Sequence, residues 1–372
     1  MPVNHPDRLL PAGPARELAR ALYASVAHAP IVSPHGHTDP AWFATDAPWA
    51  NATTLLIQPD HYVYRMLYSQ GIALEDLGIG VLPEDLSDDR ARAIWRTFAA
   101  NFRLFRGTPS RMWFDHVFGE VFGFDQRFGP DTADAFYDAI NAALATPAYR
   151  PRALLDRFNI ECIATTESPL DDLAHHAACD PEFEGFAANL TRFGEITGED
   201  TGHWAGYLAA HRARRAFFAL HGATSTDHGH PTAATANLSR VECEQLYARV
   251  RWGGASPEDA ERFRAQMLTE MAKMSVDDGL VMQIHPGSFR NHNRTVFERF
   301  GRDKGADIPM RTDYVRALKP LLDAVGGERD LSIIVFTLDE STYARELAPL
   351  AGHYPCLKLG PAWWFHDSPE GM

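Results

Sequence analysis

Residues 279–287 read GLVMQIHPG, and this stretch decides the fold class. A nearly continuous apolar run ends in a histidine, a proline and a glycine, which predicts a strand buried on both faces with a polar residue at its C-terminal end. Five further stretches repeat this pattern: residues 30–37 (PIVSPHGH), 159–166 (NIECIATT), 222–229 (GATSTDHG), 331–339 (LSIIVFTLD) and 356–365 (CLKLGPAWWF). The sequence therefore predicts six strands of a parallel sheet.

Helical patterns separate the predicted strands. Residues 239–250 open with a Ser239–Glu242 capping box, and residues 256–274 open with Ser256 followed by a proline. Apolar residues recur at helical spacing in the second segment and predict a buried stripe, formed by Phe263, Met267, Met271 and Met274. Strands that alternate with helices indicate an α/β protein.

Polar side chains stand at the C-terminal ends of nearly all these strands. They are His35, His37, Thr166, Glu167, Asp227, His228, His285 and Asp339. A (β/α)8 barrel gathers such residues at its mouth, whereas a doubly wound sheet binds ligands only near one switch point. We therefore predict a (β/α)8 TIM-type barrel with its active site at the C-terminal ends of the strands.

One long stretch departs from the alternation of strands and helices. Residues 51–151 are rich in aromatic residues and mostly helical in pattern, for example at 89–105 and 132–145. The predicted organisation is an N-terminal segment with the first barrel strand (1–50), a mostly helical insertion (51–151) and the remainder of the barrel (152–372).

The amino-acid composition limits the kinds of molecule that this protein is expected to bind. Lys and Arg number 35 against 49 Asp and Glu, and the net charge of −14 argues against nucleic acid or an anionic membrane as partner. No secretory leader pattern is seen in the first 22 residues, and no GxGxxG turn indicates a nucleotide cofactor. The four cysteines lack metal-site spacing, so we expect reduced, mostly buried thiols and a cytoplasmic location.

Two histidines carry the first candidate site. His35 and His37 are two residues apart, and on a strand their imidazoles face the same side. Two imidazoles at the mouth of a barrel suit a divalent metal such as zinc, although an isolated pair of this kind also fits a structural role.

Two further motifs carry acid–base groups. Asp60, His61, Tyr62 and Arg65 place a phenol where it could relay a proton or hold a substrate hydroxyl, or simply pack at a helix start. The run TDHGH at 226–230 sets a carboxylate, Asp227, among imidazoles, which fits either proton transfer or a hydrogen-bonded turn.

The last two motifs suit an acidic sugar. Arg290 follows His285 by five residues, and a guanidinium grips a carboxylate with two hydrogen bonds, although a surface arginine has the same appearance. Trp363 and Trp364 either pack at the rim or stack on a sugar ring.

Taken together, these motifs resemble uronate isomerase, the glucuronate/galacturonate isomerase of the amidohydrolase superfamily. The resemblance rests on HGHTDP at 35–40, DHYVYR at 60–65, TDHGHPTA at 226–233, QIHPGSFRNHN at 283–293, FTLDE at 336–340 and GPAWWFHDSPEGM at 360–372. It implies a barrel with a helical insertion after the first strand. It also implies interconversion of a hexuronate aldose and its ketose in uronate catabolism.

The resemblance also assigns residues. It implies that His35 and His37 bind the metal and that Tyr62, Asp227, His285 and Arg290 are active-site residues. We expect Tyr62, Asp227 and His285 to serve catalysis. The residues expected to bind the uronate are Arg290, His61, Arg65 and Trp364.

Two family motifs have no counterpart in the printed sequence. The family has an Arg-Pro-Asp motif on its third barrel strand and an Asp-x-Arg motif on its last strand, whose Asp completes the metal site. Six candidate strands are found where a barrel needs eight, so an incomplete barrel is expected, with open sheet edges. We accordingly expect weakly bound zinc and impaired turnover, with Asp227 as the candidate substitute ligand.

Two other functions remain open at this level. A metal-dependent hydrolase of an acidic small molecule would use the same groups, and a catalytically impaired remnant would bind a sugar acid without turnover. A homo-oligomer is compatible with each of these functions.

Overall fold

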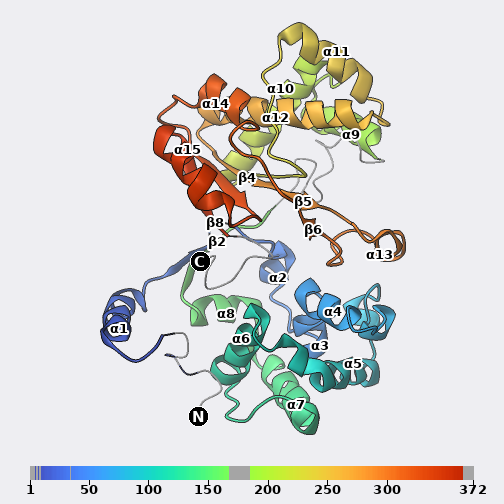
Figure 1. The fold of residues 1–372 in the computed structure, drawn as a ribbon. Helices are drawn as coiled ribbons and strands as arrows, with labels where there is room; N and C mark the ends of the chain where they lie inside the picture. The colour runs from blue at the N-terminus through green and yellow to red at the C-terminus, as the bar shows by residue number, and fades with distance from the viewer. Residues whose placement is uncertain (1–4, 6, 8–9, 34, 167–184, 363–372) are drawn as a thin grey trace. The chain divides into compact units, whose positions relative to one another are not determined.

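A computed structural model describes residues 5, 7, 10–33, 35–166 and 185–362. The chain divides into two compact units (Figure 1). The first, here called the helical unit, comprises Met1–Thr166 and Asn291–Asp307. The second, the sheet unit, comprises Glu167–Arg290 and Ile308–Met372.

A four-stranded parallel sheet forms the centre of the sheet unit, with the order β3-β4-β7-β8. Its strands are β3 (Ser225–His230), β4 (Val281–Pro286), β7 (Ile333–Thr337) and β8 (Leu357–Ala362). Along β3 and β4 the register pairs Asp227 with Gln283 and Gly229 with His285. The central residues Met282, Ile284 and Ile333 are fully buried, as their apolar runs predicted.

Helices cover this sheet and supply its core. They are α9 (Phe186–Thr197), α10 (Trp204–Leu220), α11 (Arg240–Val250), α12 (Pro257–Asp278), α14 (Lys319–Val325) and α15 (Ala348–His353), with a π-turn, η7 (Tyr343–Leu347), before α15. Both predicted helix starts are confirmed, because Ser239 caps α11 in a capping box with Glu242 and Ser256 caps α12. The predicted apolar stripe of α12 is buried in the core of the unit.

The helical unit carries a short parallel pair of strands, β1 (Ile31–Ser33) and β2 (Ile160–Ile163). Its α-helices are α1 (Pro14–Val26), α2 (Pro40–Thr45), α3 (Ala52–Leu56), α4 (His61–Tyr68), α5 (Asp88–Asn101), α6 (Pro109–His116), α7 (Ala133–Leu144), α8 (Pro151–Arg157) and α13 (Arg294–Phe300). Short turns complete it: η1 (Glu75–Leu77), η2 (Pro83–Asp85), η3 (Phe102–Phe105), η4 (Val117–Val121), η5 (Pro130–Thr132) and η6 (Pro147–Tyr149).

Aromatic side chains build the core of the helical unit. Trp95 and Phe98 of α5 are completely buried. The Trp95 ring lies 6.2 Å from that of Phe118 and 5.1 Å from that of Phe128, and the Phe98 ring lies 5.5 Å from that of Phe128. The Trp95 indole donates to the carbonyl of Ala133 at 2.9 Å, which satisfies its one polar atom. The segment 51–151 contains α3, α4, α5, α6 and α7, and its assignment as an insertion after the first strand stays a prediction.

A small antiparallel pair was not predicted. β5 (Ser288–Phe289) pairs with β6 (Ile308–Pro309), and the chain between them, Asn291–Asp307, belongs to the helical unit. The two strands are too short to leave a periodic pattern in the sequence.

All six predicted strands are confirmed, and the fold is α/β with parallel sheets. The parallel strands of the described residues form a pair and a set of four, so the closed barrel stays a prediction. One detail of the sequence analysis was wrong, because β1 ends at Ser33 and not at the predicted position 37. Of the cysteines in the described residues, Cys243 and Cys356 are buried and Cys162 is exposed, in agreement with the expectation of mostly buried thiols.

Cys179, Glu167 and Trp364 lie outside the described residues, as does Trp363. Among the helices that the structure describes, none has the length and apolar content needed to span a bilayer.

A histidine without a sequence motif lies in the core of the sheet unit. His211 of α10 is 2% exposed, and its ring meets Phe193 at 4.8 Å and Tyr207 at 4.6 Å. Burial, with the positive charges of Arg215 and Arg212, lowers the pKa of His211 to about 3. The imidazole is therefore neutral in the folded protein, whereas in the unfolded chain it takes up a proton below its ordinary pKa.

This difference predicts acid sensitivity. Because the pKa of His211 is lowered on folding, its contribution is complete above pH 6.5 and is lost as the pH falls from there towards 3. Between pH 7 and pH 5 the unfolding free energy should fall by about 2 kcal/mol through this group. Urea unfolding at the two pH values measures this, and His211→Gln should remove most of that part of the pH dependence. The exposed His221→Gln is the control; equal pH dependence in all three proteins would contradict the assignment.

Candidate active site

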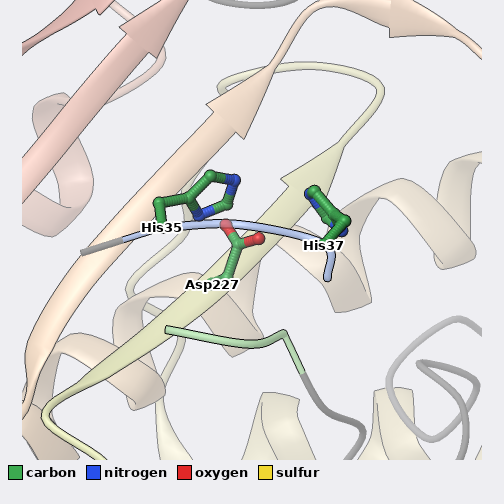
Figure 2. A group of neighbouring side chains, drawn as sticks. All are labelled: His35, His37 and Asp227. Atoms are coloured by element: carbon green, nitrogen blue, oxygen red, sulfur yellow. The ribbon is translucent and has the colours of Figure 1, made fainter. Parts of the chain in front are cut away.

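His35 and His37 lie just beyond the end of β1. Their ring centroids are 5.1 Å apart and their planes are nearly perpendicular, with His35 half-buried and His37 exposed. Figure 2 draws these two side chains, and it draws Asp227 of β3, a residue of the other unit. All three side chains carry the nitrogen or oxygen donors that zinc binds.

The residues after β2 hold this histidine segment in place. The Thr166 hydroxyl donates to the carbonyl of Gly36 at 2.7 Å, and the amide of Ala164 donates to the carbonyl of Ser33 at 2.9 Å. A Cβ at Gly36 would stand 3.1 Å from the Ala164 carbonyl oxygen, closer than a side chain tolerates without displacement. Glycine between the two histidines therefore permits the close approach of the two segments.

Tyr62 and its neighbours occupy the first turn of α4. The Asp60 carboxylate caps this helix by accepting from the Tyr62 amide at 2.8 Å, and burial raises the pKa of Asp60. The His61 ring stacks on the Tyr62 ring at 4.6 Å, and the Arg65 guanidinium carbon lies 4.9 Å from the centre of the same ring. Burial lowers the pKa of Arg65. The structure thus brings His61, Tyr62 and Arg65 together.

Asp227 and His285 form the centre of the site in the sheet unit. The Asp227 Oδ1 and the His285 Nδ1 are 2.5 Å apart, and the His285 side chain is 3% exposed. The His285 ring also stacks on Phe336 of β7, with centroids 4.0 Å apart. A carboxylate on one nitrogen and an aromatic face against the ring fix the orientation of this imidazole.

Arg290 reaches the same end of the sheet. A Cβ built on Gly229 of β3 would lie 3.7 Å from Nη2 of Arg290, so the guanidinium packs against the backbone at that glycine. Gly229 is the register partner of His285. The sheet unit therefore gathers an imidazole, a carboxylate and a guanidinium at the C-terminal ends of β3 and β4, as the sequence predicted.

His228 of β3 is hydrogen-bonded within its own strand. His228 Nε2 lies 3.0 Å from the Thr226 hydroxyl, and burial, with the neighbouring His230, lowers the pKa of His228 to about 3. Its imidazole is neutral at physiological pH. In contrast to Asp227, it is paired along its own strand.

An open hollow of about 600 Å³ lies beside the C-terminal end of β7. Acidic Asp339 and Glu340 line it, with Arg311 and Arg345. Asp339 is held in a tight turn, because its carboxylate accepts from the Ser341 amide at 3.1 Å. Charged groups of both signs thus border this strand end.

Sequence reasoning gave no site role to two residues that support the site. Phe336 opens the FTLDE motif at 336–340, but its stacking on His285 has no local signal. Gln283 opens the QIHPG motif, and its amide donates to the Ser225 hydroxyl at 3.1 Å. Its position as a polar residue within an apolar strand was the local signal for it.

A family model described as glucuronate isomerase matches this chain in two parts, over residues 14–183 and 177–372. The chain belongs to this family. Curated uronate isomerases from Rhizorhabdus wittichii and Xanthomonas axonopodis pv. citri are 67% and 64% identical to it. Each match covers 99% of this chain and 82% of the relative.

Solved structures agree with this membership. The glucuronate isomerase from Caulobacter crescentus is 58% identical, with a TM-score of 0.94, and the match covers 100% of this chain and 82% of the other. The uronate isomerase from Thermotoga maritima has a TM-score of 0.86 at 24% identity, covering 96% of this chain and 81% of its own, and supports the fold alone. This family member is thus an α/β enzyme of the isomerase class.

Proposed function

We propose that this chain interconverts a hexuronate aldose and its ketose. The substrate pairs are D-glucuronate with D-fructuronate and D-galacturonate with D-tagaturonate, as steps of uronate catabolism. One observation carries the proposal beyond family membership: the buried His285 imidazole pairs with Asp227, and the Arg290 guanidinium packs at Gly229, at the ends of adjacent strands. The pair suits hydroxyl groups and the guanidinium suits a carboxylate, which are the two functional groups of a sugar acid.

The reaction moves a proton from C2 to C1 of the open-chain sugar through an enediol. In our proposal Arg290 grips the uronate carboxylate, which leaves the other end of the chain to reach the acid–base groups. His285 and Asp227 hold hydroxyl groups by hydrogen bonds. Tyr62 relays a proton between oxygens, and its phenol stays close to the Arg65 guanidinium.

Further substrate contacts come from three side chains. His61 and Arg65 stand on the same helical turn as Tyr62 and offer donors to the sugar hydroxyls. Trp364 is the third, and its indole would stack on the sugar ring.

A divalent metal, most simply zinc, fits the two histidines. Two imidazoles that share one tetrahedral zinc have ring centres about 5 Å apart, given zinc–nitrogen bonds of about 2 Å. The 5.1 Å between the rings of His35 and His37 matches this separation. We propose Asp227 as the carboxylate ligand. When bound, the metal would polarise the sugar oxygens and stabilise negative charge that develops on them.

A cytoplasmic location completes the proposal. Cys243 and Cys356 are buried free thiols, which are typical of a reducing compartment. The partner that we propose is the small uronate substrate itself.

Metal binding gives the first test of this assignment. His35→Ala and His37→Ala should each lower the zinc affinity at least about tenfold, because each removes a nitrogen ligand. Competition with a chromophoric chelator measures the affinity, and metal analysis after dialysis measures the content. His353→Ala, at an exposed histidine on α15, is the matched control and should bind zinc like the unchanged chain. Equal affinity in all four proteins would rule out the two histidines as ligands.

Turnover tests the function directly. Purified chain incubated with D-glucuronate or D-galacturonate should form the corresponding ketose slowly, in line with the impaired turnover expected from the sequence, and ¹³C NMR should show it as a new C2 resonance. Arg290→Lys keeps the positive charge but loses the planar fork, so the KM for the uronate should rise at least about tenfold with a smaller change in kcat. Absence of ketose from both sugars with folded protein would reject the function, and an unchanged KM in the variant would reject the role of Arg290.

A further inference from the structure

We propose that Asp307 is a positioning residue for Arg290. Its buried carboxylate fastens the backbone directly after Arg290 and so fixes the guanidinium that receives the substrate carboxylate. The inference rests on the proposed function, since it concerns the same substrate group.

The chain before Arg290 is fastened by the β5–β6 pair. Phe289 is the register partner of Ile308, and the amide of Met310 donates to the carbonyl of Gly287 at 2.7 Å. Backbone hydrogen bonds therefore hold the approach to Arg290 from one side. They stop at Phe289, the residue immediately before it.

The backbone after Arg290 is held by a side chain and not by the β5–β6 pair. Asn291 has a φ of +54°, a left-handed conformation that interrupts a strand and removes its amide from the regular ladder. The Asp307 Oδ1 accepts from this amide at 2.6 Å. One residue further, the amide of His292 donates to the carbonyl of Ala306 at 2.8 Å. The side chain of Asp307 thus replaces the carbonyl that a continued strand would have supplied.

Burial strengthens the hydrogen bond between the Asp307 carboxylate and the Asn291 amide. Asp307 is 3% exposed, and a hydrogen bond from an amide to a charged carboxylate is stronger than one between neutral groups. The cost of dehydrating a carboxylate is tolerated only where its hydrogen bonds are kept. Loss of the hydrogen bond from the Asn291 amide to Asp307 would therefore make the backbone at Asn291 more mobile, because water does not replace the buried carboxylate as an acceptor.

The segment that carries Asp307 is itself anchored in the helical unit. Val296 of α13 is buried in the aromatic core, and the Tyr64 hydroxyl donates to the carbonyl of Asp303 at 3.0 Å. Asp303 has a φ of +58°, and Gly305 has a φ of +70° and lies so close to Arg65 that a Cβ there would meet it at 3.0 Å. These contacts give Asp307 a rigid base on the unit that contains α4.

The consequence is a specific kinetic signature. With both neighbours of Arg290 fixed, the guanidinium needs little reorganisation when the substrate carboxylate arrives. Removal of the Asp307–Asn291 hydrogen bond should weaken carboxylate binding and leave the chemistry at C1 and C2 largely intact. It should therefore change KM far more than kcat.

The experiment compares Asp307→Ala with Asp307→Asn in the full chain. Asp307→Ala should raise the KM for the hexuronate about tenfold and leave kcat within about threefold. Asp307→Asn keeps an acceptor oxygen of the same size and should restore KM to within about threefold of the unchanged chain. Amide hydrogen exchange at Asn291 should accelerate in the alanine variant and stay slow in the asparagine variant.

Asp115→Ala is the control for loss of a buried carboxylate. Asp115 lies in the same unit and pairs with Arg111 at 2.9 Å, so this variant should lower stability without raising KM. Unchanged KM in a folded Asp307→Ala protein, or an equal rise in Asp115→Ala, would overturn the positioning role. If the unchanged chain turns over neither hexuronate, the proposed function fails. The role of the Asp307–Asn291 hydrogen bond is then tested by hydrogen exchange of the Asn291 amide. Equal protection of this amide in Asp307→Ala and in the unchanged chain would refute that role.

Discussion

The parallel hydrogen-bond ladder between β3 and β4 is the constraint on which the candidate active site depends. Its register sets Gly229 opposite His285 and Asp227 opposite Gln283. Asp227 can therefore reach the His285 imidazole, and the missing side chain at Gly229 leaves room for the Arg290 guanidinium. A shift of one residue would turn Asp227 to the opposite face and leave His285 buried without its carboxylate.

The core behind this ladder makes the register costly to change. Met282 and Ile284 alternate with Gln283 and His285 along β4, and both apolar side chains are completely buried. A slip would place the amide and the imidazole in that core and would remove the two apolar side chains from it. The hydrophobic effect thus holds the polar groups of the candidate site in place, although none of them belongs to the hydrophobic cluster.

Local patterns predicted most of the fold. The apolar runs located all six parallel strands, and the capping residues Ser239 and Ser256 located the starts of α11 and α12. The grouping of these strands was beyond local patterns, because pairing joins residues far apart in sequence. The parallel strands of the described residues form a pair and a set of four, and their closure into one barrel stays a prediction.

The residues of the candidate site could be predicted where they follow a strand or begin a helix. Asp227, His285 and Arg290 were found in this way, and the structure brings them together. Asp307 was not found, because it stands 16 residues from its partner Asn291 on a segment without a periodic pattern. Positive φ at Asn291 is a property of the folded backbone, and the sequence carries only the preference of asparagine for that conformation.

A crystal structure of the chain with D-gluconate, a sugar acid that cannot isomerise, tests the central claim most directly. The account predicts the ligand carboxylate on the Arg290 guanidinium in a two-pronged contact and a ligand hydroxyl within hydrogen-bonding distance of the Asp227–His285 pair. A carboxylate bound elsewhere, with Arg290 turned away from the ligand, would contradict it.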